Sequence, residues 1–296
     1  MNMYDVIIIG GSYAGLAAAM PLVRARRKVL VVDAGERRNR FARSSHGFLG
    51  QDRNDPGAIA AAGKAEILRY PTVTWLEGLA TEARHSEGEF VVRANGTDHV
   101  AHRVIMALGL KDELPPVSGL EERWGKSVFH CPFCHGYELN QGKIAVLATS
   151  PASEHHGLML PDWGPTTYFT NGQFEPEHPD ALAKRGAVIE RTPVESVSGT
   201  PGEAITLHLR DGRQLEFAGL FLAPKSRPAS NLAEQLGCEL EHGPTGPFIK
   251  TDSTCETTVR GVFACGDAAM AAGSVPFAVG TGATAGVACY RSLAFG

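Results

Sequence analysis

Two cysteines separated by two residues carry the clearest chemical signal in this chain. Cys131 and Cys134 lie in the sequence His-Cys-Pro-Phe-Cys-His. Such a pair can close a small disulfide ring and exchange it with another thiol. His130 and His135 flank the pair, and an imidazole with an ordinary pKa of about 6.5 can accept or return a thiol proton. The pattern predicts a redox dithiol whose catalytic residues are these two cysteines and two histidines.

Two other interpretations of the cysteine pair remain open. A zinc site would need a second pair of cysteine or histidine ligands at suitable spacing. The pair could also consist of inert core cysteines. The remaining cysteines occur singly, so we predict no metal site and expect them to be small buried apolar residues. They are Cys238, Cys255, Cys265 and Cys289.

A glycine-rich turn near the start of the chain is the second chemical signal. Apolar residues 4–9 predict a buried parallel strand that runs into Gly10-Gly11-Ser12-Tyr13-Ala14-Gly15 and then into a helix. A second apolar run over residues 28–32 ends at Asp33. Backbone amides of such a turn can hold a pyrophosphate, and the acid can bind a ribose hydroxyl. Ser12 replaces the middle glycine of the usual pattern, and a tight turn that binds nothing is the alternative.

Composition and charge exclude several classes of protein. The chain has 296 residues, of which 43% are hydrophobic, so it can bury one large or two ordinary cores. Its net charge of −4 argues against a nucleic-acid or anionic-membrane partner. No apolar run approaches the roughly 20 residues that span a bilayer, and the first residues do not resemble a secretory leader. Six cysteines without such a leader predict a cytoplasmic protein with thiols.

The order of the predicted elements indicates two α/β halves. Further strands are expected at residues 73–76, 90–93 and 104–107, followed by a charged, proline-rich linker at 110–116. A second group of strands follows, and the Pro/Gly-rich stretch 243–247 then returns the chain to the first half. We predict one domain from residues 1–112 and 245–296, and a central domain from 113–244.

Together these motifs resemble the low-molecular-weight thioredoxin reductase family over essentially the whole chain. Besides the turn and the cysteine pair, the resemblance rests on Ala107-Leu108-Gly109 and on residues 261–267, Gly-Val-Phe-Ala-Cys-Gly-Asp. It implies an α/β fold with two three-layer Rossmann-like dinucleotide-binding domains, the first discontinuous and FAD-binding. It also implies a homodimer in which Cys134 faces the flavin and Cys131 exchanges with the substrate. His135 stands where the family usually has an aspartate.

The resemblance further implies which residues bind FAD. The pyrophosphate would lie on the glycine turn, the adenosine ribose near Asp33, the ribityl chain near Asp267 and the flavin ring near residues 273–275. The resemblance places His46 near the flavin. The alternative interpretation is an ordinary loop histidine. The predicted cofactor-binding residues are Gly10, Gly11, Ser12, Ala14, Gly15, Asp33, Ala34, Arg40, His46, Gly47, Ala107, Gly109, Gly266, Asp267, Ser274 and Val275.

The second half departs from the NADPH-using members of the family. After the strand expected near residues 143–147, the chain reads Ala148-Thr-Ser-Pro-Ala-Ser153, with no glycine and with a proline that removes a donor amide. The next strand leads into Thr170-Asn-Gly172, where a cationic patch for a 2′-phosphate is expected. The nicotinamide site is therefore predicted to be degenerate.

With this loss, the chain resembles a branch of flavin dithiol oxidases from the gliotoxin and holomycin pathways. That branch closes a disulfide in a dithiol and passes the electrons through FAD to oxygen. One alternative is a thioredoxin-disulfide reductase fed by ferredoxin, flavodoxin or NADPH, and another is a flavin-containing redox sensor. The substrate is either a small dithiol or disulfide metabolite or a thioredoxin-like protein.

Overall fold

The computed structural model describes residues 3–86 and 88–296, which form two compact units. Unit 1 contains the described residues up to Arg38, together with Asp55–Lys111 and Ser226–Gly296. Unit 2 contains Asn39–Asn54 and Asp112–Lys225. The chain passes between them in β7 (Leu110–Glu113) and β16 (Lys225–Pro228), and these two segments pair with each other.

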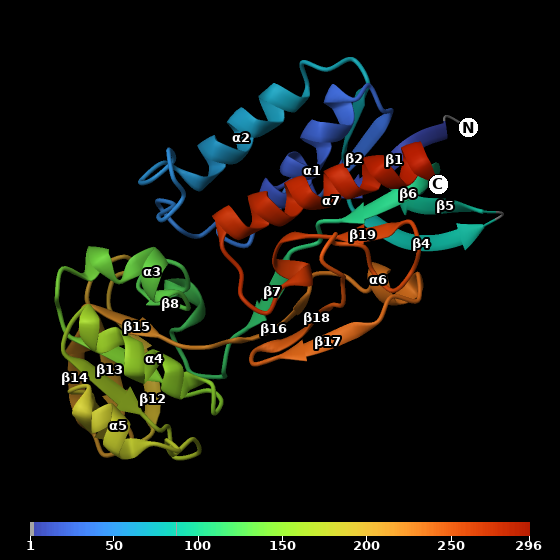
Figure 1. Cartoon of the computed structure of the whole chain (residues 1–296). Coiled ribbons are helices and arrows are strands. Elements are labelled where there is room, and N and C mark those ends of the chain that lie inside the picture. The colour runs from blue at the N-terminus through green and yellow to red at the C-terminus, as the bar shows by residue number, and fades with distance from the viewer. Residues whose placement is uncertain (1–2, 87) are drawn as a thin grey trace. The chain divides into compact units, whose positions relative to one another are not determined.

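Unit 1 is built on a mixed sheet with the strand order β3-β2-β1-β6-β5-β4 (Figure 1). The second half of β6 also pairs in parallel with β19. The strands of this sheet are β1 (Met3–Ile9), β2 (Val29–Asp33), β3 (Val73–Glu77), β4 (Ala80–Ser86), β5 (Glu89–Ala94), β6 (Thr97–Met106) and β19 (Val262–Ala264). A separate hairpin contains β17 (Leu240–Gly243) and β18 (Gly246–Ile249). The helices are α1 (Tyr13–Arg24), α2 (Pro56–Ile67), α6 (Leu232–Gln235), η4 (Gly266–Ala269) and α7 (Val275–Phe295).

Apolar residues cover both faces of this sheet, as the continuous apolar runs predict. Val6 and Ile8 face a core that includes residues of α1 and α7, whereas Ile7 and Ile9 face a second core that includes residues of α6 and β18. The sheet therefore forms the middle of three layers. Helices α1 and α7 lie side by side (Figure 1). They approach closely because Gly282 has no side chain, and a Cβ there would overlap the backbone of Ala14.

Unit 2 contains a parallel sheet with the strand order β11-β10-β9-β15-β8 and a separate antiparallel meander, β12-β13-β14. Its strands are β8 (Val128–Phe129), β9 (Ile144–Leu147), β10 (Thr166–Phe169), β11 (Val188–Glu190), β12 (Val194–Ser198), β13 (Ile205–Leu209), β14 (Gln214–Phe217) and β15 (Gly219–Phe221). Its helices are η1 (Glu121–Arg123), α3 (Pro132–His135), η2 (Tyr137–Leu139), α4 (Ser153–Met159), η3 (Leu160–Asp162) and α5 (Pro179–Lys184). Residues of β9 alternate between two cores on opposite faces of the parallel sheet.

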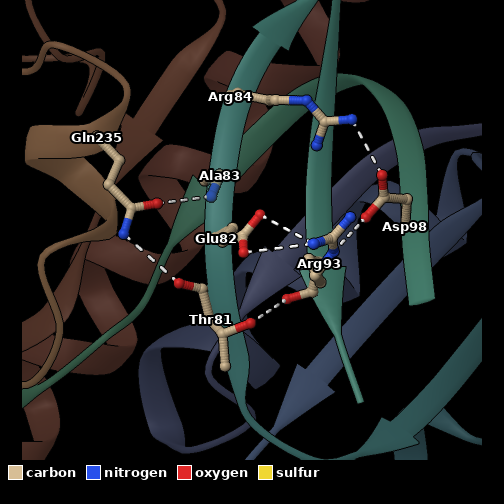
Figure 2. Close-up of polar contacts among 7 residues, drawn as sticks. All are labelled: Thr81, Glu82, Ala83, Arg84, Arg93, Asp98 and Gln235. Carbon is tan, nitrogen blue, oxygen red and sulfur yellow. Dashed lines mark hydrogen bonds and ion pairs between the residues drawn. The ribbon is translucent and has the colours of Figure 1, made fainter. Parts of the chain in front are cut away.

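The structure places the return to unit 1 at Ser226, earlier in the chain than the boundary expected at residues 244 and 245. The Pro/Gly-rich stretch at 243–247 is instead the turn of the β17–β18 hairpin within unit 1. Figure 2 shows one anchor of the returning segment, where the side chain of Gln235 accepts a hydrogen bond from the Ala83 amide at 2.9 Å. This contact gives the Ala83 amide, on the outer edge of β4, a hydrogen-bond acceptor.

The predicted first domain also differs from unit 1 at residues 39–54, which the structure groups with unit 2. Gly125 of unit 2 shows why, because a Cβ at that position would touch Phe41. In the described part of the chain, no helix combines the length and the apolar character needed to cross a membrane. The same residues include no group of three or more His, Cys, Asp or Glu side chains arranged to hold a metal ion.

Candidate active site

The glycine turn of unit 1 forms a cradle that leaves no space for side chains. Gly10 has a φ of +106°, and a Cβ there would overlap the carbonyl oxygen of Ala107. A Cβ on Gly15 would overlap the carbonyl oxygen of Gly10. Beside the turn and the first residues of α1 lies a hollow of about 400 Å³, lined in part by Gly11, Ser12 and Ala34. A hollow of this volume accommodates the adenosine part of a dinucleotide.

Asp33 ends β2 at the rim of this hollow. Its Oδ1 accepts hydrogen bonds from the amides of Gly11 and Gly35, each at 3.2 Å. These bonds fix the carboxylate beside the turn, as a ribose-binding acid requires. The glycine cradle, the twelve-residue helix α1 and this acid fit a dinucleotide such as FAD.

The carboxylate of Asp267, in η4, is paired with a cation that sequence reasoning missed. Arg38 Nη1 lies 3.0 Å from Asp267 Oδ2, and both side chains are 18% exposed. A Cβ on Gly273 would touch the same carboxylate. Nearby, Ser274 caps α7 by accepting a hydrogen bond from the Phe277 amide at 3.3 Å. The arginine-rich run at residues 37–40 indicates a cation in this region. A run of charges does not show which of its guanidinium groups pairs with Asp267.

The structure divides the predicted cofactor-binding residues between the two units. Arg40, His46 and Gly47 belong to unit 2, whereas the others belong to unit 1. Arg40 stacks on the Phe41 ring at 4.3 Å. In unit 1, Ala107 and Gly109 directly follow β6, and Gly266 donates its amide to the Thr281 hydroxyl at 3.0 Å. Ala14 and Val275 lie in the first turns of α1 and α7.

The cysteine pair lies at the start of the short helix α3, directly after the parallel strand β8. Cys131 is the residue before the helix, and the Cys134 amide donates to the Cys131 carbonyl at 3.2 Å. This single turn places the two side chains three positions apart on neighbouring sites of one helical face. Both cysteines are half-buried, while Phe133 between them is 72% exposed and packs edge-on against Trp163.

The environment of His135 changes the proton chemistry expected of it. Its ring stacks on Phe129, with ring centroids 4.3 Å apart. Burial, and to a lesser degree the charge of His46, lowers the pKa of His135 to about 4. The expectation of a pKa near 6.5 is therefore wrong, since desolvation disfavours the imidazolium. At neutral pH the ring is uncharged and returns any proton that it accepts.

His156 is a residue beside the cysteine helix that the sequence analysis did not identify. It lies in α4, is 8% exposed and has its ring near Phe221. Burial lowers the pKa of His156 to about 4, although a hydrogen bond with the backbone of His130 partly opposes this shift. That bond connects α4 to the residue just before Cys131. His155 and His156 are adjacent in the sequence, and the sequence alone does not show which of the two side chains is buried.

We expect His156 to make the folded protein less stable in mild acid. Because its folded pKa is about 4, the unfolded chain binds more protons between pH 6.5 and 4, so stability falls as the pH falls through that window. The loss from pH 7 to pH 5 should be about 2 kcal/mol for this one residue. In His156→Gln, denaturant unfolding at the two pH values should show a loss smaller by that amount. The partly exposed His102→Gln serves as the control, and an unchanged pH dependence in His156→Gln would contradict the assignment.

The turn after β9, where a nicotinamide dinucleotide would bind, uses its own donors internally. The amides of Thr149 and Ser150 both donate to Ser153 Oγ, at 3.0 and 3.3 Å. Glu154 follows, 8% exposed, with its carboxylate accepting from the amides of Glu177 and His178 at 2.9 Å each. The amides of Thr149 and Ser150 are therefore already engaged and are not free to bind a phosphate. This internal bonding is consistent with the predicted degeneration of the nicotinamide site, which stays a prediction.

The four single cysteines are buried, as expected, and all lie in unit 1. Burial raises the pKa of each of these thiols above its ordinary value. A raised pKa keeps a thiol protonated and poorly nucleophilic. These four residues therefore contribute to packing.

Comparison with known proteins identifies the family. The chain matches the family described as pyridine nucleotide-disulphide oxidoreductase over residues 4–148 and 172–283. It is 33% identical to thioredoxin reductase sirT of Leptosphaeria maculans, covering 96% of this chain and 93% of that one. Among solved structures, it is similar to an oxidoreductase from Agrobacterium tumefaciens, with 55% identity, 99% coverage of both chains and a TM-score of 0.95. It is also similar to HlmI, with 33% identity, coverage of 98% and 92%, and a TM-score of 0.90.

These matches agree with the cradle of unit 1 and with the cysteine helix of unit 2. They confirm the two Rossmann-like α/β domains, the oxidoreductase activity and the use of FAD that the sequence motifs implied. The chain belongs to the pyridine nucleotide-disulphide oxidoreductase family and is a thioredoxin reductase-like flavoenzyme.

Proposed function

We propose that this enzyme is a dithiol oxidase that passes electrons from a dithiol through FAD to oxygen without using NADPH. The observation that carries the proposal is the turn after β9. Ser153 occupies the amides of Thr149 and Ser150, and the buried carboxylate of Glu154 follows directly in the chain. The glycine cradle of unit 1 remains intact beside its hollow. The chain thus keeps the features that hold FAD and lacks those that hold a nicotinamide donor.

The cysteine pair performs the exchange with the substrate. A substrate thiolate attacks Cys131 in the Cys131–Cys134 disulfide, and Cys134 leaves as a thiolate. The second substrate thiolate then attacks the substrate sulfur of this mixed disulfide, so the substrate disulfide closes and Cys131 leaves. Two electrons pass from the substrate to the pair. Bound FAD would supply the two-electron chemistry that reoxidises the pair and delivers the electrons to oxygen.

Unit 1 would hold the cofactor through the residues that form its cradle. The amides of the Gly10–Gly15 turn would bind the pyrophosphate at the start of α1, and Asp33 would bind the adenosine ribose. Asp267, already paired with Arg38, would bind the ribityl chain. We also propose that the enzyme is a cytoplasmic homodimer, in line with its buried thiols and its family resemblance.

A thioredoxin-type reductase fed by a ferredoxin-like donor is a second candidate. Phe133 and Tyr137, on either side of Cys134, are 72% and 75% exposed. Exposed aromatic side chains beside a reactive centre favour contact with a protein partner. This arrangement would suit a thioredoxin-like substrate better than a small metabolite.

Anaerobic mixing with each electron donor tests the proposal. We expect dithiothreitol to bleach the flavin band, NADPH at the same concentration to leave it unchanged, and air to restore the colour rapidly. The dithiol exchanges at Cys131, whereas NADPH finds no phosphate site. Rapid bleaching by NADPH would contradict the proposal, and slow recovery in air would favour the ferredoxin-linked reductase. Thioredoxin reductase from another source provides the positive control for NADPH.

A further inference from the structure

In unit 2, His46 lies between two carboxylates next to the cysteine helix. Its Nδ1 is 3.5 Å from Asp52 Oδ1 and 3.6 Å from Glu138 Oε1. The Gly47 amide donates to the same oxygen of Asp52 at 3.0 Å, which fixes that carboxylate in the loop. Glu138 belongs to η2, which follows α3 and its Cys134. The loop at residues 39–54 therefore meets the cysteine segment at this histidine.

This arrangement determines which nitrogen of His46 carries a proton in the neutral ring. Two carboxylate oxygens lie near Nδ1, an arrangement that favours the tautomer with hydrogen on Nδ1 and leaves Nε2 as the acceptor. A carboxylate that holds Nδ1–H in this way orients a histidine to act as a base through Nε2. The side chain is 13% exposed and lines a hollow of about 400 Å³ that opens to solvent. Ser44, Arg53, Tyr137, Glu138 and Asn140 also line it.

His135, the residue next to Cys134, cannot be the final acceptor of a thiol proton. Its ring is stacked on Phe129, and burial lowers its pKa to about 4, with a smaller contribution from the charge of His46. The geometric link between the two histidines is Glu138, which lies 3.6 Å from His46 Nδ1 and three positions after His135 in the chain. A proton accepted by His135 at neutral pH must therefore pass to another group before the next turnover.

We propose that His46, held by Asp52 and Glu138, receives the thiol proton from the cysteine site and releases it to solvent through the hollow. The role deepens the proposed oxidase function and rests on it. The two substrate thiols lose two protons and two electrons. Both electrons go to the cysteine pair, one proton goes to the departing Cys131, and Cys134 remains a thiolate. The second proton passes by way of His135 to Nε2 of His46.

The charges around His46 agree with a transient imidazolium. Asp52 and Glu138 provide two negative charges at Nδ1, and the cation Arg53 lies 4.0 Å from Asp52. Besides these groups, the loop at residues 39–54 carries Arg40 and Arg43, and helices α3 and η2 carry Cys134, His135 and Tyr137. These charges lie beside Nδ1, and the hollow gives a proton that the ring carries a route to water.

The test is anaerobic stopped-flow reduction of the FAD-loaded enzyme by dithiothreitol from pH 6 to pH 9. We expect His46→Gln to slow flavin bleaching about 100-fold at pH 7. The deficit should shrink toward pH 9, where the dithiol arrives as a thiolate, and added imidazole should restore part of the rate at pH 7. His178→Gln is the matched control, since it removes another histidine–glutamate pair of unit 2, with Nδ1 3.3 Å from Glu154.

Each outcome of this experiment decides the role of His46. A uniform loss at all pH values, without rescue by imidazole, would show a structural role and overturn the proposal. Wild-type rates in His46→Gln would overturn it while leaving the oxidase function intact. A wild-type enzyme that dithiothreitol does not bleach would overturn the oxidase function and this role together.

Discussion

Cys134→Ser is expected to abolish flavin bleaching by dithiols, with a rate loss of at least about 10³-fold, while the purified protein stays yellow. A serine hydroxyl cannot form a disulfide with Cys131 or leave as a thiolate, so neither exchange step can occur. Cofactor binding should survive, because Cys134 lies in unit 2 and the glycine cradle lies in unit 1. Anaerobic absorbance in the flavin band after addition of dithiothreitol measures the effect.

Cys238→Ser is the matched control for this substitution. Cys238 is buried in unit 1, and its Sγ donates to Thr257 Oγ1 at 3.4 Å, a bond that a serine hydroxyl can also make. We expect this variant to bleach at the wild-type rate. Normal bleaching of Cys134→Ser would show that electrons reach FAD without the pair, and the proposed mechanism would fail.

Gly15→Ala is expected to remove FAD from the purified protein, with a loss of affinity of at least about 100-fold. The added Cβ would overlap the carbonyl oxygen of Gly10, so the turn and the start of α1 must move apart. The amides that would bind the pyrophosphate then lose their common direction. The ratio of flavin to protein absorbance and a titration with FAD measure the loss, and circular dichroism shows whether the fold is retained.

Gly280→Ala is the control for this second prediction. Gly280 lies in α7, and a Cβ there would meet no other atom within 4 Å. Alanine also favours a helix more than glycine does, so this variant should bind FAD normally and be slightly more stable. Full FAD binding by Gly15→Ala would show that the cofactor does not depend on this cradle.

The nucleotide turn, the acid after the second strand and the cysteine pair could all be predicted from the sequence, because each is a local pattern. A run of β-branched residues that enters a glycine turn and then a helix specifies a βαβ unit over about 30 residues. The prediction of a degenerate second turn is also local, since it depends on residue types between positions 148 and 153. The structure adds that Ser153 Oγ takes up the amides of that turn.

Tertiary structure alone decided which distant residues meet. Arg38 and Asp267 are 229 positions apart in the chain, and no periodicity predicts that they form an ion pair. The boundary of unit 1 depends in part on Gln235 of α6 bonding to β4, a contact across 152 positions (Figure 2). Proline and glycine between residues 243 and 247 indicate a turn, but not whether the turn closes a hairpin or connects two domains.

For the histidines too, the sequence gives their positions, whereas the fold sets their acid–base properties. Their positions beside the cysteines are a fact of the sequence, but burial and neighbouring charge, which only the folded chain defines, set the pKa of each imidazole. His135 loses basicity because it is buried against Phe129, while His46 gains two carboxylate partners through the loop at residues 39–54. The sequence by itself therefore determined the chemistry available to this enzyme. The fold decided that His135 loses basicity, because desolvation acts through space and not along the chain.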